Sequence, residues 1–256
     1  MAQMLKSVRQ ALNLLELLQH LPSLGVSDAA DKLGISSSTA HRLLATMQAA
    51  NFVQQTGPGR KYQLGPAMKS FRDSAAIDQL LEISAPPMVT LRDQTGETVH
   101  LATLSGTSTK FIAAFESPQL MRVISRVGRI LPAHTTAAGK LLLSYLSADE
   151  LTDLYPDRRL DHGTTASLQT LDDLLVELES VRQLGYGRNM AESEPGIAAL
   201  AVPVTARDGQ FTYALTVSGP DSRFNPERKL ALSEREESLL TMLRQAARRI
   251  EATFPL

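Results

Sequence analysis

Hydrophobic residues recur with helical spacing over most of the first 50 positions. A first helix is predicted over residues 5–19, with one apolar side made of Val8, Leu12, Leu15 and Leu18. A short second helix is predicted over 28–33, with Ser27 as its N-cap and Gly34 as its C-cap. Ser36 caps a third helix that runs to about residue 49, whose apolar side is Ala40, Leu43, Leu44 and Met47. Two short helices around a tight turn predict a helix-turn-helix.

The third helix has a polar side suited to DNA. Hydroxyl residues fill its first turn, and His41 and Arg42 point away from its apolar side. Backbone N–H groups and hydroxyls at a helix N-terminus meet phosphates in the major groove, where Arg and His reach base edges. The candidate DNA-binding residues of this helix are Ser36, Ser37, Ser38, Thr39, His41 and Arg42.

A strand, a Gly-Pro-Gly turn and a second strand are predicted over 52–64. Arg60 and Lys61 make the tip of this hairpin basic, and together with Tyr62 they complete the candidate DNA-binding residues. Three helices and a basic hairpin form a winged helix, whose wing adds backbone or minor-groove contacts. A small helical packing module is the alternative, and the hairpin, its charge and its position favour the winged helix over it.

A helical linker is predicted over 66–83, with an apolar side of Met68, Phe71, Ala75 and Leu81. Pro86 and Pro87 are expected to interrupt the helix, which resumes briefly over 88–94. The apolar stripe indicates that the linker packs, either on its own domain or on the linker of a partner chain.

Period-two alternation begins at residue 97. Strands are predicted over 99–104, 110–116, 120–127, 197–206 and 211–218. Asp208 and Gly209 form the turn between the last two, and Pro203 indicates a sheet edge or a bulge. Helices are predicted over 132–146, from Ser147 to about 155, from Thr170 to Gly185, and from Ser233 through Ile250. This order predicts an α+β domain, a largely antiparallel sheet with helices packed against it.

Length and composition limit the class of protein. The 256 residues suffice for one small and one larger domain, here 1–65 and 84–256, joined by the linker over 66–83. No apolar run reaches the length of about 18 residues that a membrane span needs, and the N-terminus lacks a secretion signal, so no membrane partner is expected. The absence of cysteine excludes disulfides, thiolate metal sites and a cysteine nucleophile, and it fits a cytoplasmic protein.

Charge is divided unevenly between the two domains. Residues 1–65 carry six Lys or Arg against three Asp or Glu, a net charge of +3, which leaves 20 basic and 24 acidic residues, a net charge of −4, for the remainder. A basic head on an acidic body is typical of a DNA-reading domain attached to a domain that does not bind nucleic acid. Six cations are few for tight binding at physiological salt. A second copy of the head is therefore expected, which predicts a dimer.

The search for catalytic motifs in the sequence finds none. Five histidines, at positions 20, 41, 100, 134 and 162, lack the spacing of a zinc site, and Asp161 with His162 fits a solvated loop better than a metal site. There is no GxSxG, no GxGxxG after a strand and no GxxxxGK[ST]. We expect no enzyme activity, no cofactor and no metal.

Small and hydroxyl-bearing side chains gather in two segments. Residues 132–139 place them at a predicted helix N-terminus, where free N–H groups and the helix dipole attract a carboxylate. Ala198, Ala199, Thr216 and Ser218 add similar side chains on neighbouring strands. A pocket for a small anion and tight helix–sheet packing explain this pattern equally well.

Seven segments in register resemble the isocitrate lyase regulator (IclR) family of bacterial transcription regulators. They are SVRQALNLLELL, LGISSSTAHRLLATM, YQLG, TGETVHLA, RVGRILPAHTTAAGK, RQLGYGRNMAESEPGIAALAVPV and ALTVSGPDSRF. The resemblance extends over nearly the whole chain, from about Ser7 to the C-terminal helix. The resemblance implies a winged helix-turn-helix, a helical linker and a C-terminal effector domain similar to GAF and PAS sensor folds. It also implies that the protein binds a palindromic operator near catabolic genes, either as a homodimer or as a homotetramer built as a dimer of dimers.

The resemblance further implies which residues contact the effector. By motif position they are Leu120, Ala137, Ala138, Asn189, Ile197, Ala199, Thr216 and Ser218. Some relatives carry a cysteine and acidic residues along the pocket, where this chain has Ala199 and Asn189. A different effector follows, and a cysteine-dependent metal site is excluded.

The expected function is that of a ligand-responsive, DNA-binding regulator of a catabolic operon. Its partners would be double-stranded operator DNA and a small carboxylate or aromatic metabolite as effector. Two alternatives stay open: an enzyme that transforms a small molecule and carries an appended nucleic-acid-binding module, and a constitutive architectural binder whose pocket is filled by side chains. The sequence does not identify the effector, the operator, the sign of regulation (repressor or activator) or the choice between dimer and tetramer.

Overall fold

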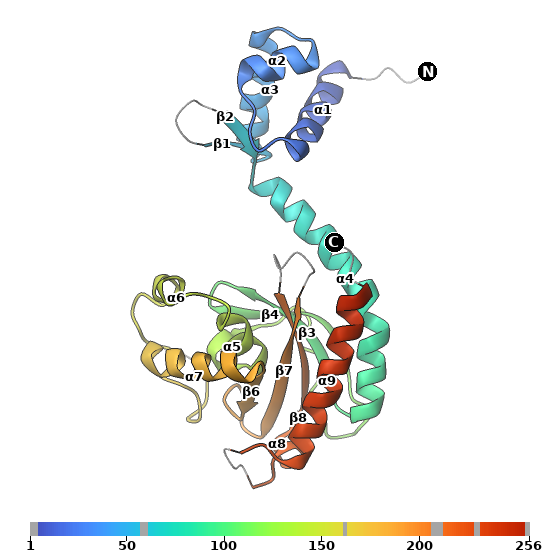
Figure 1. The fold of residues 1–256 in the computed structure, drawn as a ribbon, viewed down its shortest axis with the longest axis vertical. Helices are drawn as coiled ribbons and strands as arrows, with labels where there is room; N and C mark the ends of the chain where they lie inside the picture. Colours follow the sequence, from blue (N-terminus) through green and yellow to red (C-terminus); the bar gives the residue numbers. More distant parts are fainter. Residues whose placement is uncertain (1–4, 57–60, 161–162, 206–211, 228–230, 254–256) are drawn as a thin grey trace. The chain divides into compact units, whose positions relative to one another are not determined.

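The computed structural model describes residues 5–56, 61–160, 163–205, 212–227 and 231–253. The chain divides into two compact units, residues 1–78 and 79–256, and helix α4 (Pro66–Thr95) runs across the boundary between them (Figure 1). Because α4 has no break at residue 83 or 84, the three-part division 1–65, 66–83 and 84–256 stays a prediction. Among the described residues, none of the helices combines the length and apolarity needed to cross a bilayer.

The first unit has the order of elements predicted for a winged helix. Its elements are α1 (Lys6–His20), α2 (Val26–Leu33), α3 (Ser37–Ala49), β1 (Val53–Thr56) and β2 (Lys61–Leu64). The two strands pair antiparallel, and an isolated bridge from Leu24 to Tyr62 extends the hairpin. Gly34 adopts a left-handed conformation with φ 62°, which glycine reaches without steric cost, and it ends α2 as predicted.

The start of α2 lies earlier than predicted. The helix begins at Val26, and the carboxylate of Asp28 accepts a hydrogen bond from the backbone N–H of Gly25 at 3.3 Å. Ser27 therefore lies inside the helix and is not its N-cap. The aspartate satisfies the free donor at the helix start from the third helical position, so the chain needs no hydroxyl cap there.

The buried side of α1 also differs from the predicted one. Leu14 and Leu18 enter the core of this unit, whereas Val8 and Leu12 are more than half exposed. Two apolar stripes with helical spacing run along this leucine-rich helix. Packing against α2 and α3, and not the spacing, selects the stripe that is buried.

Helix α4 is continuous over 30 residues, so the predicted interruption at Pro86 and Pro87 is wrong. Each proline removes one backbone hydrogen bond from the helix, but burial of the neighbouring side chains stabilises the helix through both positions. The buried positions of this part of the helix are Leu80, Ser84, Met88 and Leu91. Of the predicted stripe, Met68 and Leu81 are partly buried, and the side chains of Phe71 and Ala75 lie outside the described part of the structure.

The second unit is a six-stranded antiparallel sheet with helices packed against it, which confirms the predicted α+β class. The strand order is β5-β4-β3-β8-β7-β6. The strands are β3 (Thr98–Ser105), β4 (Ser108–Phe115), β5 (Ile130–Pro132), β6 (Gly187–Met190), β7 (Ile197–Thr205) and β8 (Thr212–Pro220). The helices after α4 are η1 (Ala133–Thr135), α5 (Ala137–Leu143), α6 (Ala148–Leu154), α7 (Leu171–Leu184), α8 (Asp221–Phe224) and α9 (Glu234–Thr253).

The two faces of the sheet carry side chains of different size. On β7 and β8 one set of alternate positions holds Ala199, Ala201, Ala214, Thr216 and Ser218, and the other holds Leu200, Val202, Leu215 and Val217. The three alanines of the first set pack in one cluster with the start of α5. The large side chains are fully buried, and α9 packs on these two strands (Figure 1). Small residues thus leave space on the α5 face of the sheet.

Residues 120–127 do not form the predicted strand. Side chains of β3 hold this segment in place of a backbone ladder: the hydroxyl of Thr98 donates to the carbonyl of Val123 at 2.5 Å, and the backbone N–H of Arg126 donates to Nε2 of His100 at 3.3 Å. The next strand along the chain is β5, which ends at Pro132 where a helix was predicted to begin. That helix begins after Thr136, as α5.

Strand β7 explains how a proline fits into this sheet. It lies between β8 and β6, but β6 ends opposite Ala201, so Pro203 faces no strand on that side. The predicted sheet edge is therefore local, and the register with β8 runs without a bulge through Pro203. Strand β6 was not predicted, since Gly187–Met190 is short and polar. The predicted turn at Asp208 and Gly209 lies outside the described residues.

Helix caps are where prediction and structure agree best. Ser36, Ser147 and Thr170 each accept a hydrogen bond from the backbone N–H three residues later. Ser233 forms the predicted capping box with Glu236 at the start of α9. The predicted apolar side of α9 is buried throughout: Leu239, Leu240, Leu243, Ala247 and Ile250.

Candidate effector pocket and DNA interface

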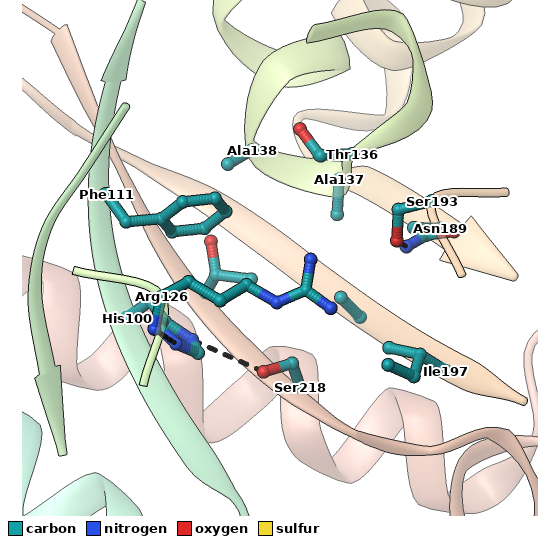
Figure 2. A pocket seen from close by; sticks show the side chains of 12 residues that line it. His100, Phe111, Arg126, Thr136, Ala137, Ala138, Asn189, Ser193, Ile197 and Ser218 are labelled. Atoms are coloured by element: carbon teal, nitrogen blue, oxygen red, sulfur yellow. Dashed lines mark hydrogen bonds between the residues drawn. The ribbon is translucent and has the colours of Figure 1, made fainter. Parts of the chain in front are cut away.

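A pocket lies between the small-residue face of the sheet and the start of α5 (Figure 2). Its walls are His100, Phe111, Arg126, Thr136, Ala137, Ala138, Asn189, Ser193, Ile197, Ala199, Thr216 and Ser218. Seven of the eight residues predicted to contact an effector are in this set, and the eighth, Leu120, is not. The segments that sequence reasoning paired are thus close together in space.

Strand register explains why distant residues meet in the pocket. Asn189 of β6 pairs with Ala199 of β7, which pairs with Ser218 of β8, so these three residues form one row across the sheet. One step along, Thr216 of β8 pairs with His100 of β3. Neighbouring rows on one face of a sheet lie close enough to contact one ligand.

Leu120 is a correction to the predicted site. Its side chain is 100% exposed, and it lies in the bends that follow β4 rather than in a strand. The prediction depended on the position of a motif, and it required residues 120–127 to pair with the sheet. Because the sheet ladder does not include this segment, nothing directs Leu120 into the pocket.

Of the other five wall residues, Thr136 lies in the predicted pocket segment 132–139, and sequence reasoning missed four: His100, Phe111, Arg126 and Ser193. His100 and Phe111 could have been found from strand alternation, because each lies on a predicted strand. Arg126 belongs to the RVGR part of a recognised motif but fell on a wrongly predicted strand. No signal in the sequence pointed to Ser193.

His100 is held in one neutral form inside the pocket wall. Its Nε2 accepts the backbone N–H of Arg126, so Nδ1 carries the ring proton and donates to the hydroxyl of Ser218 at 3.3 Å. Burial, assisted by the positive charge of Arg126, lowers the pKa of His100 to about 4. The ring is therefore uncharged at neutral pH, and it packs edge-to-face with the ring of Phe111 at a centroid separation of 5.2 Å.

Arg126 brings a positive charge into the pocket. Its Nη2 lies 3.1 Å from a carboxylate oxygen of Glu194. Burial lowers the pKa of Arg126, and the negative charge of Glu194 opposes that shift. Because a guanidinium stays protonated in proteins, the pocket contains a permanent cation. Figure 2 shows this guanidinium between Ala137 and Ser218.

The start of α5 packs very closely against its neighbours. Thr136 caps this helix, accepting from the backbone N–H of Gly139 at 2.9 Å and bonding to Thr109 at 2.8 Å. A Cβ on Gly139 would lie 2.2 Å from the carbonyl oxygen of Ala133, and one on Gly187 would lie 2.1 Å from that of Ala137. Glycine at 139 thus lets α5 approach Ala133, and glycine at 187 lets β6 approach the start of α5. The predicted attraction of a carboxylate by this helix end stays a prediction.

The pocket contains an unsatisfied polar atom. The hydroxyl of Thr216 is buried and has no hydrogen-bond partner among the described residues. Such an atom costs free energy unless a ligand or water satisfies it. The free space measures about 20 Å³, room for about one water molecule, because the Arg126 side chain crosses the pocket.

A buried ionic cluster supports the wall behind Asn189. The side-chain amide of Asn189 accepts a hydrogen bond from the backbone N–H of Glu192 and donates one to the hydroxyl of Ser193, both at 2.9 Å. The carboxylate of Glu192 in turn accepts a hydrogen bond from Lys140 Nζ at 2.9 Å, and the same ammonium donates to Glu177 at 2.8 Å. Burial raises the pKa of Glu192, opposed by the charge of Lys140. This cluster ties the loop after β6 to α5 and α7.

The polar side of α3 is open to solvent. Ser37, Ser38, His41 and Arg42 are exposed, and Thr39 is partly exposed. The hydroxyl of Ser36 is engaged in capping the helix, where it accepts from Thr39 N at 3.2 Å. Lys61 is exposed at the start of β2, and Arg60 lies outside the described residues. Among the described candidates, all except Tyr62 are thus exposed or partly exposed to solvent.

Tyr62 is a second correction. It is 3% exposed, and its ring packs in the core of the first unit. Its backbone N–H and carbonyl both bond to Leu24, at 2.9 and 2.8 Å. Alternation along β2 turns Lys61 outward and Tyr62 inward, so Tyr62 positions the hairpin and cannot contact DNA with its ring.

The described residues contain no group of three or more His, Asp or Glu side chains placed to hold a metal ion. His162 and Asp161, considered from the sequence as a pair, lie outside those residues. The two units therefore present a reading head and a pocket. A winged helix joined through one long helix to a pocket-bearing sheet domain is the arrangement expected of a one-component transcription regulator.

Comparison with known proteins identifies the family. The model described as "IclR helix-turn-helix domain" matches residues 7–57, and "Bacterial transcriptional regulator IclR C-terminal" matches residues 75–252. The HTH-type transcriptional regulator KdgR of Escherichia coli is 31% identical over 249 residues, which are 96% of this chain and 91% of the relative. The chain belongs to the IclR family, and it is a DNA-binding transcription regulator rather than an enzyme.

Solved structures agree with this assignment. An IclR-family transcriptional regulator from Rhodococcus sp. matches with a TM-score of 0.68 and 28% identity, over 98% of this chain and 97% of that one. An IclR homologue from Microbacterium hydrocarbonoxydans, complexed with 4-hydroxybenzoate, matches with a TM-score of 0.59 and 22% identity, over 96% and 98%. The second likeness concerns the fold alone.

Proposed function

We propose that the pocket between α5 and the sheet binds a small carboxylate or aromatic metabolite, and that this ligand sets the affinity of the winged helix for operator DNA. The observation that carries the proposal is that the row Asn189–Ala199–Ser218 and the buried cation Arg126 line the same pocket. The 4-hydroxybenzoate bound by the Microbacterium homologue combines both ligand chemistries and is a reasonable first probe. Catabolic enzymes encoded beside this gene would narrow the choice.

On the DNA side, the proposed contacts are the exposed residues of α3 and the wing. They are Ser37, Ser38, Thr39, His41, Arg42 and Lys61, with Arg60 added from the sequence and Ser36 contributing through its cap. One winged helix has few cations with which to bind phosphates, so two copies on a palindromic site would supply the affinity for operator DNA. A homodimer or a dimer of dimers, acting on DNA in the cytoplasm, completes the proposal.

Ion pairs offer a route from the pocket to α4. Glu97 follows the end of α4 and is 1% exposed. Its two carboxylate oxygens accept hydrogen bonds from the guanidinium of Arg223 at 2.7 and 2.6 Å. Arg223 also donates to the carbonyl of Met121 at 3.1 Å, in the same segment that carries Arg126 to the pocket. A ligand that moves Arg126 would thus act on the end of α4. Typical coupling of this kind is about 1–3 kcal/mol.

Two measurements test the proposal. Melting temperature against a panel of small carboxylates and aromatics detects binding, because a ligand of the folded state stabilises it by mass action. Operator affinity with and without each binder then detects coupling. A chain that binds operator but responds to no member of the panel would be a constitutive architectural binder, a candidate favoured by the Arg126 side chain that crosses the pocket.

A further inference from the structure

Among the described residues that line the pocket, Arg126 alone brings a full charge into it. Its side chain is 9% exposed, and the guanidinium lies among the lining residues (Figure 2). A buried cation costs free energy unless an anion or several acceptors surround it. The identity of its counter-ion therefore decides what the pocket can hold.

The counter-ion in the structure is weakly placed. Among the described residues, Glu194 is the only carboxylate within ion-pair distance of Arg126, at 3.1 Å to one oxygen, and its side chain is 46% exposed. Because the carboxylate is half exposed and makes one contact, its attraction to Arg126 is weakened by water and screened by salt. Glu194 directly follows Ser193, so its carboxylate lies beside the pocket wall.

Two other ion pairs of the same unit show the contrast. Arg223 meets Glu97 through two contacts of 2.7 and 2.6 Å, and Arg188 meets Glu236 through two of 2.8 and 3.1 Å. In both pairs the carboxylate is at most 1% exposed. These pairs join elements permanently, whereas the carboxylate of Glu194 can return to water when Arg126 gains another partner.

The remaining wall suits a ligand that would be such a partner. Phe111 and alanines at 137, 138 and 199 offer apolar contact, and the hydroxyl of Thr216 is unpartnered among the described residues. A guanidinium binds a carboxylate through two parallel hydrogen bonds. A small carboxylate with an apolar body and a polar group could therefore satisfy both Arg126 and Thr216.

We propose that Arg126 binds the carboxylate of the effector and that Glu194 is its exchangeable internal counter-ion, which an incoming carboxylate displaces. The inference rests on the proposed function, because it assigns the ligand class and the gating contact of that same pocket. Displacement frees the Arg126 side chain to leave the centre of the pocket and opens space for the ligand. Glu194 thus competes with the effector and lowers its apparent affinity.

The test uses matched ligands and the full-length protein. The probes are 4-hydroxybenzoate and lactate, each beside its neutral amide, titrated by calorimetry and by melting temperature. The variants are Arg126→Gln, Arg126→Lys and Glu194→Gln. The control is Arg122→Gln, which removes a surface ion pair with Glu116 on the same segment without touching the pocket wall. Operator affinity is measured in parallel.

At least one carboxylate is expected to bind, and its amide to bind much more weakly. Arg126→Gln should weaken carboxylate binding by at least about tenfold, because it removes a buried charged partner. Glu194→Gln should tighten it by about two- to fivefold, the range of a half-exposed ion pair. Arg122→Gln should match the unmodified protein. If Arg126→Gln does not fold, Glu194→Gln and Arg126→Lys still decide the question.

The inference is overturned if the amide binds as tightly as the carboxylate, if Glu194→Gln weakens carboxylate binding or leaves it unchanged, or if no variant binds either carboxylate. In each case an operator response to a neutral aromatic metabolite would keep the proposed function and remove this inference alone. A complete lack of operator response to any ligand that binds would remove the proposed function as well.

Discussion

The backbone N–H of Arg126 donates to Nε2 of His100 across 3.3 Å, and this bond anchors the residue that crosses the pocket to strand β3. The other ring nitrogen of His100 bonds to Ser218 of β8. One neutral imidazole thus joins two strands and the segment over 116–129. Protonation of the ring would convert the Nε2 acceptor into a donor that faces another donor.

Stability is therefore predicted to fall on mild acidification. The pKa of His100 is about 4 in the folded protein, against 6.5 ordinarily, so the unfolded chain binds a proton in this window and the folded chain does not. The contribution of His100 to the free energy of unfolding is fully present above pH 6.5 and is lost as the pH falls to 4. Its size is about 3 kcal/mol, from the pKa difference at about 1.4 kcal/mol per unit. Urea unfolding across this range measures it.

His100→Gln is the matched variant for that experiment. Glutamine keeps a hydrogen-bonding side chain at the position but cannot titrate, so its unfolding free energy should lose this part of the pH dependence. The other titrating groups are common to both proteins, and the difference between the two curves isolates His100. Parallel curves between pH 4 and 6.5 would show that His100 is not held neutral.

Lys140 is predicted to be a strong determinant of stability. Its ammonium lies 2.8 Å from Glu177 and 2.9 Å from Glu192, and its side chain is 4% exposed. Lys140→Met leaves Glu192 buried without a cation and should cost about 3–5 kcal/mol of unfolding free energy. The double variant with Glu192→Gln should recover part of that loss. Arg158→Gln, which breaks an exposed pair with Asp172, should cost less than about 1 kcal/mol.

Arg42 and Lys61 are predicted to affect DNA binding in different ways. Arg42→Ala should cost about 1–3 kcal/mol of operator binding and relax sequence preference at one position if the guanidinium reads a base. Lys61→Ala should weaken binding to all sequences and reduce the salt dependence by about one phosphate contact. Fluorescence anisotropy with operator and scrambled duplexes, at several salt concentrations, separates the two effects. Equal losses on both duplexes for Arg42→Ala would assign it to phosphate.

The Glu97–Arg223 pair is predicted to carry the coupling between pocket and DNA. Replacing both residues with glutamine removes the ionic link at the end of α4 without leaving a buried charge unpaired. Ligand affinity should change by less than about twofold, while the ligand-induced change in operator affinity should shrink toward zero from a typical 1–3 kcal/mol. An unchanged response in the double variant would place the coupling elsewhere.

Local hydrogen bonding made much of the fold predictable. Caps at Ser36, Ser147, Thr170 and Ser233 depend on side chains within three residues, and each was read correctly. The α+β class followed from alternation along β3, β4, β7 and β8. The pocket residues on β7 and β8 followed from a family resemblance and from the concentration of small side chains there.

Three of the errors share a cause, which is that packing or hydrogen bonding over long sequence distances decided them. Burial of Leu80 and Met88 keeps α4 helical through Pro86 and Pro87. Bonds from Thr98 and His100 hold residues 120–127 without a strand, which places Leu120 in solvent. Tyr62 is aromatic and next to basic residues, but its neighbours in space are the core of the winged helix. Sequence patterns do not contain these contacts.

The most direct test of the account is operator affinity measured as a function of a ligand known to occupy the pocket. Asn189→Ala and Ser218→Ala serve as the pocket variants, and the operator is selected from random duplexes. The account predicts a ligand-induced change of about 5- to 150-fold, blunted in both variants while affinity without ligand stays nearly the same. A ligand that raises the melting temperature of the protein yet leaves operator affinity unchanged at every salt concentration would contradict it.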